Sequence, residues 1–354
     1  MVSIASTPEQ LTANWLTSAL RESGHLATGN VTSVEHKIIG TGKMGDNARL
    51  TLTYDGDYKA PATLIAKLPA TDETARGMAG AMGAYSNEVM FYRHLADRTA
   101  MATPKIYASE VNNEGTDFVI LMEDLAPAEP GSQLVGESAE NTRASLREAS
   151  KLAIAFYSDD SIGELDYVTS PARTDGGAQG AALMEQCWPQ FVDRFGHGLS
   201  DECLTFGERY VEHHLTFATR FTGPKTLIHG DFRCENVLYN GSSATVVDWQ
   251  TVGESSALTD AAYFLGGSVD IDKRREWEKS FIDEYAGWLA AADIDLSANE
   301  CWEQYREFSM HGIVITVLGA VFTAAEERSD KMFLSMIQRH LQQCVDLNSA
   351  EFLE

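Results

Sequence analysis

The sequence has 354 residues, 44% of them hydrophobic and 22% charged, which is typical of a globular protein and long enough for two lobes or domains. Asp and Glu number 52 against 27 Lys and Arg, a formal net charge of −25. Nucleic acids and anionic membranes need clustered Lys and Arg, so we expect neither as a partner. The acidic charge is compatible with a cationic substrate and equally with an acidic surface that contacts only solvent.

The cysteines and the apolar stretches bear on the compartment. The five cysteines include no C-x-x-C pair, which favours neither a disulfide framework nor a zinc site and suits a reducing compartment. Residues 1–6 lack the basic start and apolar run of a signal peptide. The longest uncharged apolar stretch, residues 312–325, is short for a membrane span and suits a buried helix. We therefore expect a cytoplasmic protein.

The first part of the chain predicts a sheet-rich lobe. Thr7 to Gln10 has the composition of a helix start, with a Thr cap and Pro in the first turn. Residues 78–100 predict a mainly helical segment. Strand-like composition or alternation occurs in four segments, residues 31–39, 48–54, 62–68 and 118–122.

Beyond residue 126 the pattern changes to long helices interrupted by two short apolar strands. The change falls between residues 123 and 130, which is the best domain boundary. The predicted helices cover residues 141–157, 181–195, 201–221, 274–292 and 299–325, and the strands cover residues 237–239 and 244–247.

Gly40, Gly42 and Gly45 form a G-x-G-x-x-G pattern. Glycines let backbone N–H groups approach phosphates. A dinucleotide-binding loop leads from a strand into a helix, whereas a kinase-type phosphate loop lies between two strands. Because residues 48–54 have strand periodicity, we favour the kinase-type loop over the dinucleotide-binding one. An ordinary glycine-containing hairpin is a further alternative.

Lys67 and Glu88 each fall where a charge needs a partner. Lys67 lies in an otherwise apolar strand, where an unpaired ammonium is unfavourable. Glu88 shares the apolar face of a predicted helix with Phe91 and Leu95, three and seven positions later. We therefore predict that Lys67 and Glu88 pair. In kinases such a pair positions the lysine for the ATP phosphates, and a purely structural salt bridge is the alternative.

The segment after the apolar residues 226–228 has the residue types that phosphoryl transfer needs. Asp231 is followed five residues later by Asn236, and a predicted hairpin then leads to Asp248. One carboxylate must orient or accept the proton of the attacking hydroxyl, and carboxylate and amide oxygens must hold Mg²⁺. A single Asp or Asn near a turn is usually structural. The ordered set, downstream of Lys67, is much more specific.

Three segments carry a resemblance to a known superfamily: residues 121–125 (LMEDL), 229–238 (HGDFRCENVL) and 247–250 (VDWQ). They resemble the aminoglycoside phosphotransferase and choline kinase superfamily, and more narrowly its ecdysteroid-kinase-like (CHK kinase-like) branch and bacterial relatives. The resemblance runs from the glycine loop to the C-terminal helices. It implies an α+β, protein-kinase-like two-lobe fold, with a nucleotide-binding lobe over residues 1–125 and a helical lobe with the catalytic loop and substrate site over residues 126–354.

The same resemblance implies a role for each matching residue. Asp231 would be the catalytic base, Asn236 and Asp248 would bind Mg²⁺, and Asp260 would brace the catalytic loop. ATP is the expected nucleotide, with GTP not excluded. The remaining cofactor-binding residues are Gly40, Gly42, Gly45, Lys67 and Glu88 around the phosphates, and Met122, Glu123, Asp124 and Leu125 around the adenine.

Two departures from protein kinases bear on the substrate. Gly230 stands where protein kinases have Arg, and only about ten residues separate Gln250 from Asp260. We therefore expect no control through an activation loop, and a small-molecule alcohol rather than a protein as substrate. Members of the superfamily act on aminoglycosides, macrolides, choline, ecdysteroids and hydroxyacyl compounds, so the resemblance does not select an acceptor.

Two other function classes make distinct predictions. A catalytically silent, kinase-shaped binding protein is disfavoured because Lys67, Asp231 and Asp248 are all present. A nicotinamide-dependent oxidoreductase would need a helix directly after Gly45. Aromatic residues of the helical part could line an acceptor pocket or simply pack helices together: Trp188, Phe191, Tyr210, Trp302 and Tyr305.

Overall fold

The computed structural model describes residues 2–40, 44–55, 60–170 and 176–354. The chain forms two compact units. Unit 1 contains Met1–Arg98, Thr103–Pro127 and Val247–Thr251, and unit 2 contains Thr99–Ala102, Ala128–Val246 and Val252–Glu354. The segment that carries Asp248 therefore belongs to the first unit, although it follows more than a hundred residues of the second.

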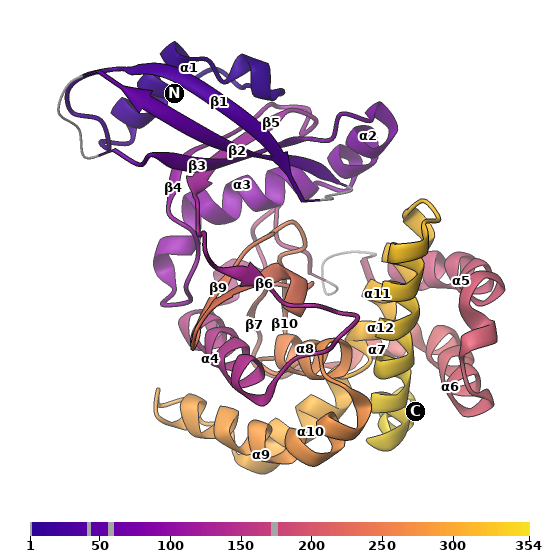
Figure 1. Cartoon of the computed structure of the whole chain (residues 1–354). Coiled ribbons are helices and arrows are strands. Elements are labelled where there is room, and N and C mark those ends of the chain that lie inside the picture. Colours follow the sequence, from indigo (N-terminus) through magenta and orange to yellow (C-terminus); the bar gives the residue numbers. More distant parts are fainter. Residues whose placement is uncertain (1, 41–43, 56–59, 171–175) are drawn as a thin grey trace. The chain divides into compact units, whose positions relative to one another are not determined.

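Unit 1 is built on a five-stranded antiparallel sheet in the order β1-β2-β3-β5-β4 (Figure 1). In β2, Leu50 and Leu52 are buried while Thr51 and Thr53 are exposed, the period-two pattern of a strand with one covered face. The strands are β1 (Val31–Ile39), β2 (Gly45–Tyr54), β3 (Thr63–Pro69), β4 (Ile106–Val111) and β5 (Phe118–Glu123).

Helices cover both faces of this sheet, with α1 (Ala13–Glu22) on one side and α3 (Ala84–His94) on the other (Figure 1). Leu16 and Leu20 of α1 share a hydrophobic core with Leu50 of β2. On the other face, Tyr85 of α3 stacks on Phe118 of β5, with ring centroids 4.3 Å apart. A further helix, α2 (Glu73–Ala81), precedes α3.

Unit 2 is mainly helical. All ten residues of α8 are buried, and α4, α10, α11 and α12 each contact it, so α8 is the central helix of this unit. The helices are α4 (Ala139–Phe156), α5 (Gly176–Phe195), α6 (Asp201–Glu212), α7 (His214–Arg220), α8 (Thr259–Ser268), α9 (Ile271–Ala290), α10 (Ala298–Phe308), α11 (His311–Phe322) and α12 (Glu327–Asp346). None of the helices in the described part of the chain combines the length and hydropathy of a membrane span.

Two small sheets in unit 2 position the loop that contains Asp231. Strand β7 ends directly before His229, and β8 begins directly after Asn236. The loop is therefore anchored by a strand at each end. One sheet pairs β7 (Thr226–Ile228) with β10 (Gly253–Ser255). The other has the strand order β6 (Glu129–Pro130), β8 (Val237–Asn240) and β9 (Ser243–Val246).

The four strands predicted for the first lobe are confirmed as β1, β2, β3 and β5, while β4 and α12 were not predicted. A helix does start after Thr7, but it is a 3₁₀ helix of three residues, Pro8–Gln10, and the Thr7 side chain makes no capping hydrogen bond. The first α-helix, α1, begins only at Ala13 and is capped by the Thr12 side chain, which accepts a hydrogen bond from Trp15 N.

Three predicted helices are interrupted. The segment 78–100 breaks at Gly83, whose φ of +71° is incompatible with a right-handed helix. The segment 201–221 divides into α6 and α7 at His213, and 299–325 divides into α10 and α11 at Ser309 and Met310. Apolar periodicity alone does not reveal such breaks, because the apolar face continues on both sides of each one.

Candidate active site

The Lys67 ammonium lies between two carboxylates in unit 1. Its Nζ is 2.6 Å from Glu88 Oε2 and 2.8 Å from Asp248 Oδ1, so the predicted Lys67–Glu88 pair is confirmed. Burial opposes the charge on Lys67, but Asp248 and Glu88 outweigh it and raise the pKa of the ammonium. Burial also raises the pKa of Glu88. Asp248 is the accessible member of the group, with 38% of its side chain exposed.

Helix α3 holds the segment around Asp248. The fully buried Trp249 stacks on Phe91, with ring centroids 3.5 Å apart and planes within 7°. Asn87 Nδ2 donates a hydrogen bond to Gln250 O at 3.1 Å. Asp248 itself has a φ of +71°, a left-handed conformation that Asp tolerates better than most residues. These contacts aim the Asp248 carboxylate at Lys67.

The glycine loop joins β1 to β2, so the segment after Gly45 is a strand and the helix required by the oxidoreductase alternative is absent from the described residues 45–54. Gly42 lies outside the described residues. Gly40 has a φ of +71°, which favours glycine. A Cβ on Gly45 would lie 3.0 Å from Leu68 O and 4.0 Å from Lys67 Cε. The missing side chain therefore lets β2 begin close beside Lys67.

The predicted adenine-binding residues Met122, Glu123, Asp124 and Leu125 lie at the end of β5 and just beyond it. The Glu123 N–H already donates to Lys105 O at 2.8 Å. Asp124 Oδ1 accepts a hydrogen bond from Arg49 Nη2 at 3.1 Å, and Asp124 Oδ2 forms an ion pair with Arg49 Nε at 2.9 Å. In the described part of the chain, the backbone N–H and C=O of Leu125 make no hydrogen bond. Leu125 can therefore offer both a donor and an acceptor to a ligand.

The Asp231 carboxylate in unit 2 is fixed by three donors. Tyr263 Oη donates to Oδ1 at 2.7 Å, while Asn236 Nδ2 and Arg233 Nε donate to Oδ2 at 3.0 and 3.2 Å. Asn236 Nδ2 also donates to the Asp231 backbone oxygen at 2.9 Å. The side chain remains 23% exposed. A carboxylate held this way and still open to solvent can receive a hydroxyl proton from a bound alcohol.

The backbone of the same loop is held by two further side chains. Asp260 of α8 accepts from His229 N at 2.8 Å and from Gly230 N at 3.1 Å, which confirms the predicted hydrogen bonding of Asp260. His311 Nε2 is 2.8 Å from Gly230 O and must be the donor, because a carbonyl only accepts. Gly230 has a φ of +85°, a conformation in which a side chain would be strained.

The donor set predicted for a metal fits Mg²⁺ in chemical type. Both side-chain hydrogen bonds of Asn236 are donated by Nδ2, so among the described residues its amide oxygen Oδ1 has no partner. Amide and carboxylate oxygens are the ligands Mg²⁺ prefers, completed by water and phosphates. No group of three or more His, Cys, Asp or Glu within the described ranges is arranged as a metal site. Asn236 and Asp248 belong to different units, so their joint role stays a prediction.

Three residues whose side chains hold Asp231 or the backbone beside it were not predicted: Tyr263, Arg233 and His311. A sequence signal existed for the first, because Tyr263 lies three residues after Asp260 on the same helix and therefore on a similar face. Arg233 was inside the motif itself, two residues after Asp231. His311 begins an apolar helix with no local indication of its partner.

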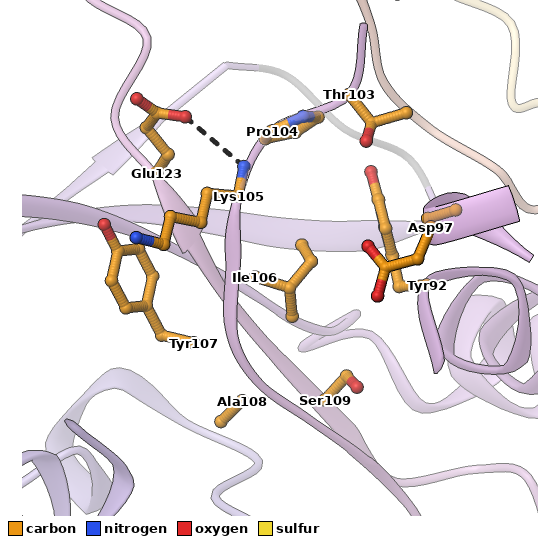
Figure 2. A pocket seen from close by; sticks show the side chains of 11 residues that line it. Tyr92, Asp97, Thr103, Pro104, Lys105, Ile106, Tyr107, Ala108, Ser109 and Glu123 are labelled. Atoms are coloured by element: carbon orange, nitrogen blue, oxygen red, sulfur yellow. Dashed lines mark hydrogen bonds between the residues drawn. The ribbon is translucent and has the colours of Figure 1, made fainter. Parts of the chain in front are cut away.

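A cavity of about 500 Å³ lies in unit 1, between the end of α3 and the start of β4. Figure 2 shows Tyr92 and Asp97 on one side, and Lys105 and Tyr107 on the other. Glu123, whose Oε2 accepts from Lys105 N at 3.3 Å, also lines it. Lys67, Glu88 and Asp248 are not among the lining residues, so this cavity is separate from the Lys67 group.

The aromatic residues considered for an acceptor pocket mostly serve as core. Phe191, Tyr210 and Tyr305 are fully buried, and Trp188 nearly so. Trp302 is partly buried and lies near Tyr305, with centroids 5.3 Å apart. These contacts support helix packing as their role.

Solved structures share this fold at low sequence identity. A Ralstonia eutropha protein classed among the aminoglycoside phosphotransferases has a TM-score of 0.53 and 13% identity, with 94% of this chain and 97% of that chain covered. Choline kinase from Cryptosporidium parvum has a TM-score of 0.52 and 12% identity, with 90% and 91% covered. The GDP complex of an aminoglycoside 2′-phosphotransferase-IIIa variant has a TM-score of 0.51 and 13% identity, with 94% and 97% covered. These likenesses establish the protein-kinase-like α+β fold.

No curated protein matches the sequence significantly. The narrower likeness to the ecdysteroid-kinase-like branch stays a prediction. The model of the phosphotransferase enzyme family matches residues 53–308, which is well over half of the chain and includes Lys67, Asp231 and Asp248. The chain therefore belongs to the phosphotransferase enzyme family.

Proposed function

We propose that this protein transfers the terminal phosphate of ATP or GTP to a hydroxyl group of a small molecule, with Asp231 as the catalytic residue. The observation that supports this most is the position of Lys67, buried in β3 between Glu88 and Asp248. A lysine held by a helix glutamate beside an accessible aspartate is the arrangement that kinases use for nucleotide phosphates.

Unit 1 supplies the nucleotide-binding residues of this proposal. Lys67, held by Glu88, contacts the phosphates, and the glycine loop with Gly40, Gly42 and Gly45 covers them. Leu125, with Met122, Glu123 and Asp124, holds the base, since its backbone N–H and C=O are available in the described structure. The GDP complex of a protein with the same fold makes GTP as reasonable a donor to test as ATP.

Unit 2 supplies the residue that acts on the acceptor. The Asp231 carboxylate orients the attacking hydroxyl and takes its proton, and the hydroxyl oxygen then bonds to the terminal phosphorus as the bond to the diphosphate leaving group breaks. Mg²⁺, when bound by Asn236 and Asp248, would neutralise charge on the phosphates. The fixed orientation of Asp231 reduces the reorganisation needed for proton transfer.

The acceptor belongs to one of the classes that this superfamily serves. One structural neighbour with a TM-score of 0.50 is a complex of APH(2″)-IIa with gentamicin, and another is a choline kinase. We therefore propose a small-molecule alcohol, with aminoglycosides, steroid-like alcohols, hydroxyacyl compounds and choline as the classes to test. A charge of −25 distributed over the whole chain does not choose among them.

The test is a phosphate-transfer screen of these alcohol classes with Mg-ATP and with Mg-GTP, following both the diphosphate and the phosphorylated alcohol. At least one class should give a phosphorylated product. Asp231→Asn should lower that rate by about 10²- to 10⁴-fold, the contribution of a general base. Glu276→Gln removes one exposed negative charge from α9 of the same unit and should retain the wild-type rate.

Asp231→Asn that transfers phosphate as fast as the wild type would remove Asp231 from the proposed role. Tight nucleotide binding with no product for any class would favour the catalytically silent binding protein. Hydride transfer to a nicotinamide cofactor is not expected, because β2 replaces the helix that a dinucleotide-binding fold requires after Gly45.

A further inference from the structure

The Tyr263 hydroxyl contacts the proposed catalytic carboxylate from the interior of unit 2. Tyr263 is fully buried in α8, and its Oη lies 2.7 Å from Asp231 Oδ1. Burial and the charge of Asp231 raise the pKa of Tyr263 well above its usual value, so the hydroxyl stays protonated and donates. Asn236 donates to the other carboxylate oxygen, Oδ2, so the carboxylate is held at both ends.

The Tyr263 ring is itself held by two histidines from other helices. His340 of α12 stacks on it face to face, with centroids 5.0 Å apart and planes within 7°. His311 of α11 meets it edge-on at 5.6 Å. Helices α11 and α12 therefore restrict the direction in which α8 points the hydroxyl.

His340 occupies a slot with no room for adjacent side chains. A Cβ on Gly266 or Gly267 would lie 2.7 Å from the imidazole ring, and one on Gly312 would lie 2.0 Å from it. Burial lowers the pKa of His340 to about 3, so the ring is neutral. Neither ring nitrogen has a hydrogen-bond partner among the described residues, which is unfavourable for a buried polar group. What the buried ring does provide is a flat face on which Tyr263 stacks.

We propose that Tyr263 is a positioning residue for phosphoryl transfer: its hydroxyl fixes the rotation of the Asp231 carboxylate about the Cβ–Cγ bond, so that the carboxylate receives the acceptor hydroxyl in one orientation. This inference rests on the proposed function of Asp231. Without the hydroxyl, Oδ1 loses its donor while Oδ2 keeps Asn236 and Arg233. The carboxylate then samples unproductive rotations. Because the proposed nucleotide residues lie in unit 1, the loss falls on kcat and spares the KM for ATP.

The test compares Tyr263→Phe with Tyr210→Phe. Each removes one hydroxyl from a fully buried tyrosine of unit 2, and the Tyr210 hydroxyl pairs with His214 Nδ1 at 3.0 Å rather than with the catalytic loop. The probe is phosphate release from Mg-ATP with water as acceptor. For Tyr263→Phe we expect kcat to fall by about 10- to 100-fold, the scale of a misplaced catalytic group, with an unchanged KM for ATP. Tyr210→Phe should keep the wild-type kcat.

Crystal structures of the wild type and Tyr263→Phe give a second readout that does not depend on activity. The Asp231 carboxylate should be rotated or occupy more than one orientation in the variant. Wild-type kcat in Tyr263→Phe overturns the inference, as does an equal loss in both tyrosine variants. If Asp231→Asn turns over as fast as the wild type, it is the proposed function that fails. An unchanged Asp231 orientation in Tyr263→Phe then overturns the positioning role as well.

Discussion

At the scale of single residues, two left-handed backbone positions shape the candidate site. Gly230 has a φ of +85° and Asp248 a φ of +71°. Gly230 can adopt this conformation without strain, and the backbone N–H groups of His229 and Gly230 both donate hydrogen bonds to the Asp260 carboxylate. At position 248, Asp is one of the few residue types other than Gly that tolerate a left-handed conformation. The Arg that protein kinases carry in place of Gly230 would be strained in this loop.

Buried histidines make the stability of the fold depend on pH. His214 lies in unit 2 with Nδ1 3.0 Å from Tyr210 Oη, and burial lowers its pKa from 6.5 to about 4. As the pH falls, the unfolded chain therefore binds a proton on this imidazole near pH 6.5, whereas the folded protein binds it only near pH 4. Stability from this group is present above pH 6.5 and is lost as the pH falls toward 4.

We expect His214→Asn, which keeps a partner for Tyr210, to flatten the pH dependence of unfolding. Between pH 7 and pH 5 the wild type should lose about 2 kcal/mol through this histidine, and the variant should not lose that part. Urea unfolding at both pH values measures the difference. Equal slopes for the wild type and the variant would contradict the assigned burial effect.

At the scale of elements, α3 organises the proposed nucleotide residues. One helix supplies Glu88 to Lys67 and also holds the 247–251 segment through Phe91 and Asn87. The packing of Trp249 against this helix is therefore what keeps Asp248 beside Lys67. In unit 2, α8 has the matching role, since it supplies Asp260 to the His229 N–H and Tyr263 to the Asp231 carboxylate.

Trp249→Ala should destabilise unit 1 and weaken nucleotide binding together. Truncating a fully buried Trp costs about 3–5 kcal/mol, and the segment that carries Asp248 would lose its stacking partner. Trp15→Ala, a partly buried Trp of the same unit, should cost less stability and leave nucleotide affinity unchanged. Chemical denaturation and calorimetric titration with Mg-ATP measure both effects. Equal nucleotide affinity in the two folded variants would argue against the role given to Trp249.

The sequence predicts those elements whose pattern is local. Lys67 and Glu88 are recognisable because a charge interrupts an apolar strand or helix face. Strand β4 is not, since all six of its residues are half-buried and show no alternation. Helix α12 was not predicted although its apolar residues recur at helical spacing, with Phe333, Ile337 and Leu341 on its buried side. Tyr263 and Trp249 act through contacts with residues far away in the chain, which periodicity does not report.

At the scale of the whole molecule, each of the two units is made of three separate segments of the chain, so no single position in the sequence divides them. Residues 247–251 return to unit 1 after the β8–β9 hairpin of unit 2, and residues 99–102 belong to unit 2 although their neighbours do not. A boundary drawn along the sequence cannot represent such exchanges. The family and the motifs were recognisable because they are short and ordered, whereas this exchange depends on three-dimensional packing.

In the proposed function, Asp231 is required for phosphate transfer but not for nucleotide binding. The most direct measurement pairs calorimetric binding of Mg-ATP with single-turnover phosphate release for the wild type and Asp231→Asn. We predict nearly equal dissociation constants and a transfer rate lower by about 10²- to 10⁴-fold in the variant. Equal transfer rates at equal nucleotide occupancy would contradict the claim.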